Sequence, residues 1–156
     1  MRVYRIASAE HADDLWTGRG GLYSESRWFP RGHRILYTSA SQALAILEYM
    51  VHDRFFTYGD MVAGEAEFPE DLRVDSLDFQ ALAPGWNNPD PVLSAPLCGP
   101  PALRWLQQGA SVALRVPSAV SQGEWNYILN PDHPDFPRIR GGLPRPLLVD
   151  PRLRQN

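Results

Sequence analysis

Apolar and polar residues alternate along several short stretches of the chain, and this period of two predicts β-strands. The alternating or continuously apolar stretches are residues 2–6, 34–38, 61–68, 111–116, 126–130 and 145–149. Residues 72–77 fit a strand or a turn, and residues 7–16 fit a short helix. The pattern therefore predicts many short strands with few helices between them.

Residues 39–52 are predicted to form a helix that is apolar in nearly every direction, which favours a buried helix. Ser39 and Gln42 have the spacing of a capping box, in which each side chain pairs with a backbone N–H of the first turn. Glu48 lies in the middle of this helix, one turn after Leu44. A buried carboxylate needs a hydrogen-bonding or ionic partner. Glu48 therefore either has an internal partner or faces a cleft in which it acts.

The second half of the chain is rich in proline, with most of the 15 prolines lying after residue 83. Residues 78–101 are accordingly predicted to be a loop, followed by a helix over 101–108 that ends at Gly109. Residues 53–60 are expected to connect the first helix to the next strand.

Length and composition predict one domain spanning residues 1–156, with 44% hydrophobic and 21% charged residues. A net charge of −3, without a run of basic residues, argues against direct nucleic-acid binding. Cys98 is the single cysteine, so no intramolecular disulfide forms, as suits a reducing cytosol. Neither a signal peptide nor a membrane-spanning apolar run is present. These features predict a cytoplasmic protein that does not bind membranes.

Two candidate features lie outside the helix. Arg27 stands beside Trp28 and Phe29, an arrangement that suits a planar anionic ligand but is also common on ordinary surfaces. His133 lies in a rigid NPDHP turn, where a structural hydrogen bond is a better interpretation than a metal ligand.

Several common chemistries lack their sequence patterns. The four histidines and the cysteine have no metal-ligand spacing, no serine lies in a GxSxG motif, and no second acid resembles Glu48. The remaining set is Arg27, Tyr37, Glu48 and Ser118. It suits cleavage of an N-glycosidic bond in a pyrophosphate-containing nucleotide, with the carboxylate stabilising positive charge on the ribose and the arginine holding the phosphates.

Motifs along nearly the whole chain resemble the RES-domain toxins of bacterial Xre–RES toxin–antitoxin modules. The matching segments are, in order, VYRI, GRGGLYSESRW, ILYTSASQALAILEYMVH, LAPGW, LRVPSAV, EWNYILNPDHPDF and VDPRL. In this resemblance the family's Arg, Tyr, Glu and Ser fall on Arg27, Tyr37, Glu48 and Ser118.

The resemblance implies an α+β, ADP-ribosyltransferase-like fold, with two antiparallel sheets around an NAD-binding cleft and flanking helices. It implies NAD+ as a substrate, with no permanently bound cofactor or metal. NAD+ would be degraded by hydrolysis or phosphorolysis, and its depletion would arrest growth. Transfer of ADP-ribose to a protein from the same pocket is the alternative, and an inactive module that only binds a partner is a third. The implied partner is a cognate Xre-like antitoxin that blocks the cleft.

The resemblance also implies individual roles. Arg27 would bind the NAD+ phosphates, and Tyr37 would pack on or orient the nicotinamide end. Ser118 would hydrogen-bond near the nicotinamide ribose, and Glu48 would favour the oxocarbenium-like transition state.

Arg5 and Asn126 are expected to shape the same pocket. Two departures from the family pattern stand out: Phe29 replaces the usual Asn of RWNSPG, and CGPPALRW places proline after glycine and lengthens the spacing to Trp105. The first is expected to change contacts at the rim of the pocket, and the second a supporting loop.

Overall fold

The computed structural model describes residues 1–52 and 61–153, so the connection expected over 53–60 lies outside the described residues. The strands are β1 (Arg2–Ser8), β2 (Leu36–Ser39), β3 (Met61–Glu67), β4 (Val74–Ser76), β5 (Ala113–Pro117), β6 (Trp125–Leu129), β7 (Arg140–Gly141) and β8 (Arg145–Pro146). The helices are α1 (Gly20–Tyr23), α2 (Gln42–His52) and α3 (Pro91–Gln108), with 3-10 turns η1 (Ala9–Asp14), η2 (Phe79–Ala81), η3 (Phe136–Arg138) and η4 (Pro151–Leu153).

The strands form one hydrogen-bonded path in the order β4-β5-β6-β2-β1-β3-β7, and β8 also pairs with β3. Among the described strands, β4 and β5 form the one parallel pair. The expected class of mixed helices and strands is confirmed, but the strands form one path in place of the two antiparallel sheets that the resemblance implied. The strand expected over residues 145–149 is shorter than predicted, because β8 ends at Pro146. Residues 7–16, which fitted a short helix, contain the 3-10 turn η1.

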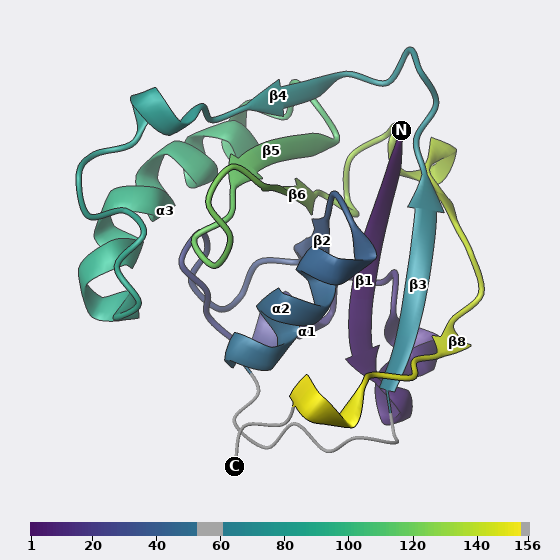
Figure 1. The fold of residues 1–156 in the computed structure, drawn as a ribbon. Helices are drawn as coiled ribbons and strands as arrows, with labels where there is room; N and C mark the ends of the chain where they lie inside the picture. The colour runs from purple at the N-terminus through teal and green to yellow at the C-terminus, as the bar shows by residue number, and fades with distance from the viewer. Residues whose placement is uncertain (53–60, 154–156) are drawn as a thin grey trace.

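The sheet has a narrow junction between β1 and β2. β1 pairs with β3 along its whole length, from Arg2↔Glu67 to Ser8↔Met61. It pairs with β2 only through Tyr4↔Ser39. Figure 1 shows the consequence: β4 and β5 run across the top of the molecule, while β1 and β3 run down it. The single path is therefore curled, with two halves that separate beyond one residue pair.

The helix expected over residues 39–52 is confirmed as α2, but the predicted cap is wrong. Ser39 is the last residue of β2, and the Ser41 hydroxyl instead accepts a hydrogen bond from the Leu44 N–H at 3.1 Å. The prediction that this helix is buried was also wrong in part, since Leu47 is 42% and Val51 60% exposed. α2 buries one side against β1 and β3 and leaves the opposite side open.

Helix α3 overturns the predicted loop over residues 91–101. Pro91 occupies the first turn, where its missing N–H costs nothing, and Asp90 accepts a hydrogen bond from the Val92 N–H at 2.9 Å. Three further prolines lie inside the helix and remove interior hydrogen bonds. A buried face compensates for this loss, with helical spacing along Ser94, Cys98, Gly99, Ala102 and Trp105. The predicted end at Gly109 is confirmed by its left-handed φ of 57°.

Cores lie on both faces of the sheet. Residues paired across antiparallel strands share a face, so Tyr37, Ser39, Asn126 and Ile128 point to the same side. On this side α3 and the 26–29 loop cover β5 and β6, while α2 covers β1 and β3. Within the described part of the chain, no helix is long and apolar enough to cross a bilayer.

Candidate active site

Glu48 has two internal partners. The Ser118 hydroxyl donates to Glu48 Oε1 at 2.7 Å, and the Asn126 side-chain amide donates to the same oxygen at 2.5 Å. The Glu48 side chain is nevertheless 20% exposed. The sequence predicted either an internal partner for this carboxylate or a position facing a cleft. The two hydrogen bonds provide the internal partners, and the partial exposure is compatible with a cleft as well.

The Ser118 hydroxyl is fully engaged by the protein. Its oxygen accepts the Val120 N–H at 3.1 Å and the Ser121 N–H at 3.0 Å, so its proton is left to bond Glu48. The hydroxyl thus links the turn after β5 to α2. In this structure Ser118 orients the carboxylate.

The second oxygen of Glu48 is less constrained than the first. Its one contact from the described residues is His52 Nε2, one helical turn away at 3.9 Å, on a side chain that is 73% exposed. One carboxylate oxygen is therefore held by two donors, while the other has, among the described residues, a longer ion-pair contact to His52.

Tyr37 and Arg5 meet at the junction of the two sheet halves. Arg5 Nη1 donates to the Tyr37 carbonyl at 2.8 Å, and its buried Nε has no partner in the described part of the protein. Desolvation lowers the pKa of Arg5, with the nearby Tyr37 opposing that shift. Burial raises the pKa of Tyr37, although its hydrogen bond to Ser26 and the charge of Arg5 act the other way. A guanidinium with a free donor thus lies beside a neutral phenol.

The raised pKa of Tyr37 predicts a loss of stability in alkali. The phenol ionises at about pH 10 in the unfolded chain and only at higher pH in the folded protein. The contribution of Tyr37 to the free energy of unfolding is therefore complete below about pH 10 and falls as the pH rises further. Urea unfolding between pH 8 and 11 should show a free energy of unfolding that falls more steeply for the wild type than for Tyr37→Phe. Equal slopes would contradict this environment for Tyr37.

Arg27 is tied to the loop before α3. Its Nη1 donates to the carbonyl oxygens of Trp86 at 2.6 Å and Asn88 at 2.8 Å. No carboxylate among residues 1–52 and 61–153 forms an ion pair with it. The loop carbonyls position the guanidinium, and the described residues provide no carboxylate to neutralise it.

The aromatic rings next to Arg27 belong to the core. Trp28 is 6% and Phe29 3% exposed, and Phe29 makes an edge contact with Trp105 at 6.4 Å between ring centroids. Stacking of these rings on a ligand, suggested by the sequence, is therefore not available. Both departures from the family pattern therefore lie in the core and not at a rim or in a loop. Phe29 is buried, and CGPPALRW lies in α3 and ends at the buried Trp105.

Ser26, which sequence reasoning missed, joins the arginine loop to Tyr37. Its hydroxyl oxygen accepts the N–H groups of Trp28 at 3.1 Å and Phe29 at 3.0 Å, and contacts the Tyr37 hydroxyl at 2.5 Å. The structure therefore makes two directly bonded groups from the predicted residues. Glu48, Ser118 and Asn126 form one, Arg5 and Tyr37 form the other, and Arg27 adjoins the second through Ser26.

Cys98 is unsuited to nucleophilic chemistry. It is completely buried, and desolvation raises the pKa of its thiol to about 11, with Arg27 opposing the shift. Its sulfur donates to the Trp86 carbonyl at 3.4 Å, the same oxygen that Arg27 contacts. The thiol therefore supports the loop that holds Arg27.

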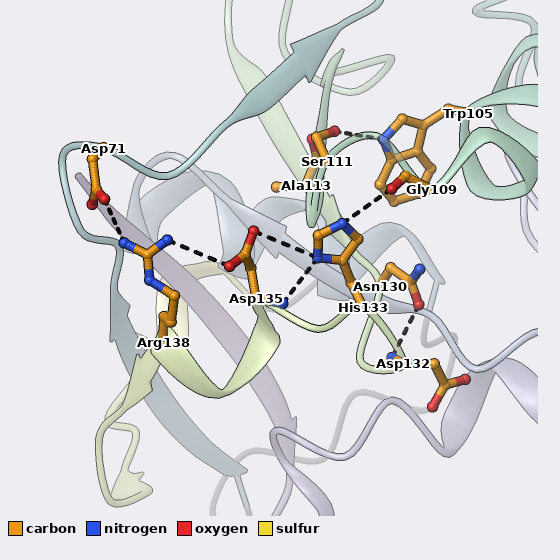
Figure 2. Close-up of polar contacts among 10 residues, drawn as sticks. All are labelled: Asp71, Trp105, Gly109, Ser111, Ala113, Asn130, Asp132, His133, Asp135 and Arg138. Atoms are coloured by element: carbon orange, nitrogen blue, oxygen red, sulfur yellow. Dashed lines mark hydrogen bonds and ion pairs between the residues drawn. The ribbon is translucent and has the colours of Figure 1, made fainter.

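His133 makes the structural hydrogen bonds that its turn predicted (Figure 2). Its Nδ1 accepts the Asp135 N–H at 3.1 Å, which leaves the proton on Nε2 to bond the Gly109 carbonyl at 3.2 Å. The ring thereby ties the end of α3 to the turn after β6. In the described part of the chain, no group of three or more His, Cys, Asp or Glu side chains could hold a metal ion.

The family model described as the RES domain matches residues 2–150. The chain belongs to the RES-domain family. This RES domain is 33% identical over 139 residues to "Toxin Res" of Photorhabdus laumondii, covering 87% of this chain and 85% of that protein. It is 31% identical over 157 residues to "Toxin Res" of Yersinia enterocolitica, covering 99% and 100%. A "Prs ADP-ribosylating toxin" of Sphingobium is 31% identical over 159 residues, covering 97% and 94%. The resemblance to RES-domain toxins is confirmed.

Proposed function

We propose that this RES domain is a toxin that cleaves NAD+ between ribose and nicotinamide in the cleft of an ADP-ribosyltransferase-like fold. The observation that carries the proposal is the Glu48 carboxylate, held through Oε1 by Ser118 and Asn126 on a side chain that is still 20% exposed. A fixed carboxylate is the group that stabilises positive charge on a ribose ring.

In the proposed reaction, the bond between ribose C1′ and the nicotinamide nitrogen breaks, and its electron pair leaves with nicotinamide. Positive charge develops on C1′ and the ring oxygen, where Glu48 Oε2 stabilises it. Either water then bonds to C1′ through its oxygen and loses a proton to solvent, or an anionic oxygen of phosphate bonds to C1′ without loss of a proton. Arg5 and Tyr37 line the junction and, with Asn126, shape the pocket for the dinucleotide.

Arg27 binds the pyrophosphate in this proposal, because its charge is not neutralised by a carboxylate among the described residues. We predict that Arg27→Ala raises the KM for NAD+ by about 10–100-fold, as expected for the loss of a charge-assisted hydrogen bond. The Trp86 and Asn88 carbonyls also lose their donor, so the free energy of unfolding should fall by about 1–3 kcal/mol.

Steady-state kinetics and urea unfolding of Arg27→Ala check both effects. Arg34→Ala is a matched control, because Arg34 is exposed and pairs with Asp132 at the surface. An unchanged KM in Arg27→Ala would remove Arg27 from the binding site.

Nicotinamide release from NAD+ by the purified protein, with and without phosphate, tests the proposal directly. Release without phosphate indicates hydrolysis, and a dependence on phosphate indicates phosphorolysis. No release under either condition, together with unchanged NAD+ in cells that express the protein, would rule out NAD+ degradation.

ADP-ribosylation of a protein is the second candidate, favoured by the name of the Sphingobium relative. Labelled NAD+ added to a bacterial lysate separates the two activities. One discrete labelled protein band supports transfer, whereas free ADP-ribose or its phosphate supports degradation. If growth arrest persists in both Arg27→Ala and Glu48→Ala, a module that only binds a partner replaces both candidates.

We propose a cognate Xre-like antitoxin as the partner of this toxin, supported by the names of the curated toxin relatives. Its expected action is to cover the cleft at Glu48. Co-expression with a helix-turn-helix protein encoded beside this chain should restore growth, and the purified pair should release no nicotinamide.

A further inference from the structure

We propose that Ser39 is a positioning residue for Glu48 and acts through the side-chain amide of Asn126. This inference rests on the proposed NAD+ cleavage. Ser39 is 4% exposed and ends strand β2, directly opposite Asn126 of β6. The two side chains therefore point to the same face of the sheet.

A chain of hydrogen bonds runs from β2 to the carboxylate. The Ser39 hydroxyl donates to Asn126 Oδ1 at 2.7 Å, and Asn126 Nδ2 donates to Glu48 Oε1 at 2.5 Å. Because a carboxylate only accepts hydrogen bonds, the NH2 group of Asn126 must face Glu48. The amide oxygen then faces Ser39, whose hydroxyl is its donor.

Loss of the Ser39 hydroxyl would leave this amide oxygen without its donor against a buried strand. An unpaired carbonyl is costly, and rotation of the Asn126 side chain away from Glu48 lowers that cost. Glu48 Oε1 would then keep only the bond from Ser118. A carboxylate with one donor has more rotational freedom, so Oε2 is less often placed for the ribose.

The neighbouring serine has a different task. Ser41 accepts the Leu44 N–H and so stabilises the first turn of α2, whereas Ser39 has no such bond. The segment Ser39-Ala40-Ser41 therefore both starts the helix that carries Glu48 and orients the amide that holds it.

The test compares Ser39→Ala and Ser39→Thr with the matched control Thr38→Val. Thr38 is 3% exposed, and its hydroxyl donates to the Tyr127 carbonyl at 2.9 Å, apart from Asn126. We expect Ser39→Ala to lower kcat for NAD+ cleavage about tenfold with little change in KM, as for one lost hydrogen bond. Ser39→Thr should retain kcat because it keeps the hydroxyl, and Thr38→Val should retain it because Asn126 is untouched.

A second readout needs no turnover. In 15N spectra, the Asn126 side-chain NH2 signal, assigned by its loss in Asn126→Asp, should be present and slowly exchanging in the wild type and Ser39→Thr. It should shift and exchange faster in Ser39→Ala.

An unchanged kcat and an unchanged amide signal in Ser39→Ala overturn the inference, as does an equal loss of kcat in Thr38→Val. A Ser39→Thr protein that folds with the wild-type melting temperature but lacks the slow signal overturns it as well. If the wild type releases no nicotinamide, the proposed function fails, while the amide signal still decides whether Ser39 orients Asn126.

Discussion

Glu48→Gln is expected to lower kcat for nicotinamide release by about 10²–10³-fold while leaving the melting temperature nearly unchanged. The amide oxygen of glutamine can still accept the hydrogen bonds from Ser118 and Asn126, so the side chain should keep its place. What it loses is the negative charge that stabilises the ribose cation in the proposed reaction. Because this charge matters only when positive charge develops on the substrate, KM should change far less than kcat.

Glu65→Gln is the matched control, since Glu65 lies on β3 and pairs with Arg2 at the surface. Its kcat and melting temperature should both remain close to those of the wild type. If Glu48→Gln retains wild-type kcat, or if the two variants lose the same activity, Glu48 is not the catalytic carboxylate. In cells, Glu48→Gln should permit growth on induction while the wild type does not.

Trp105→Ala is expected to have the largest effect on stability, lowering the free energy of unfolding by about 3–5 kcal/mol. The indole is 4% exposed and packs in the cluster that holds Phe29 and Trp86. Its Nε1 also donates to the buried Ser111 hydroxyl at 2.9 Å, so the substitution removes a hydrogen bond as well as packing (Figure 2). Urea unfolding followed by far-ultraviolet circular dichroism measures the loss.

Val92→Ala tests whether burial of the side chain, and not its place in α3, decides the loss of stability. Val92 lies in the same helix, α3, but is 76% exposed, and its truncation should change stability by less than about 0.5 kcal/mol. Similar losses in the two variants would contradict the assignment of Trp105 to the core. Trp105→Ala should also raise the KM for NAD+. The cluster that loses the indole includes Trp28 and Phe29, which follow Arg27, and Trp86, whose carbonyl oxygen accepts the hydrogen bond from Arg27.

Strands and turns with strong local signals could be predicted from sequence. The alternation in residues 61–68, the glycine at position 109 and the NPDHP turn each depend on neighbouring residues, and each forms as expected. The first part of helix α3 was not predicted, because proline is locally unfavourable in a helix. Its buried face, Ser94, Cys98, Ala102 and Trp105, gains stability only when α3 packs on β5 and β6. Tertiary burial outweighed local propensity there.

The predicted capping residue of α2 was wrong for a related reason. Ser39 and Ser41 are both acceptable N-terminal residues, and the capping-box spacing favoured the first. Pairing of Ser39 with Asn126, 87 positions away, places it in the sheet and leaves Ser41 to the helix. A pairing at that separation has no local signal in one sequence.

The sequence alone determined the family, through motifs that match the RES domain over residues 2–150, and it singled out the candidate residues Arg27, Tyr37, Glu48 and Ser118. Only the tertiary structure decided how the carboxylate is held. Ser118 and Asn126 reach Glu48 Oε1 because the β5–β6 hairpin ends beside α2, and Arg5 reaches Tyr37 because β1 and β2 separate after one residue pair. Side-chain identity is local, but hydrogen bonds between residues 70 or 78 positions apart exist only once the sheet has formed.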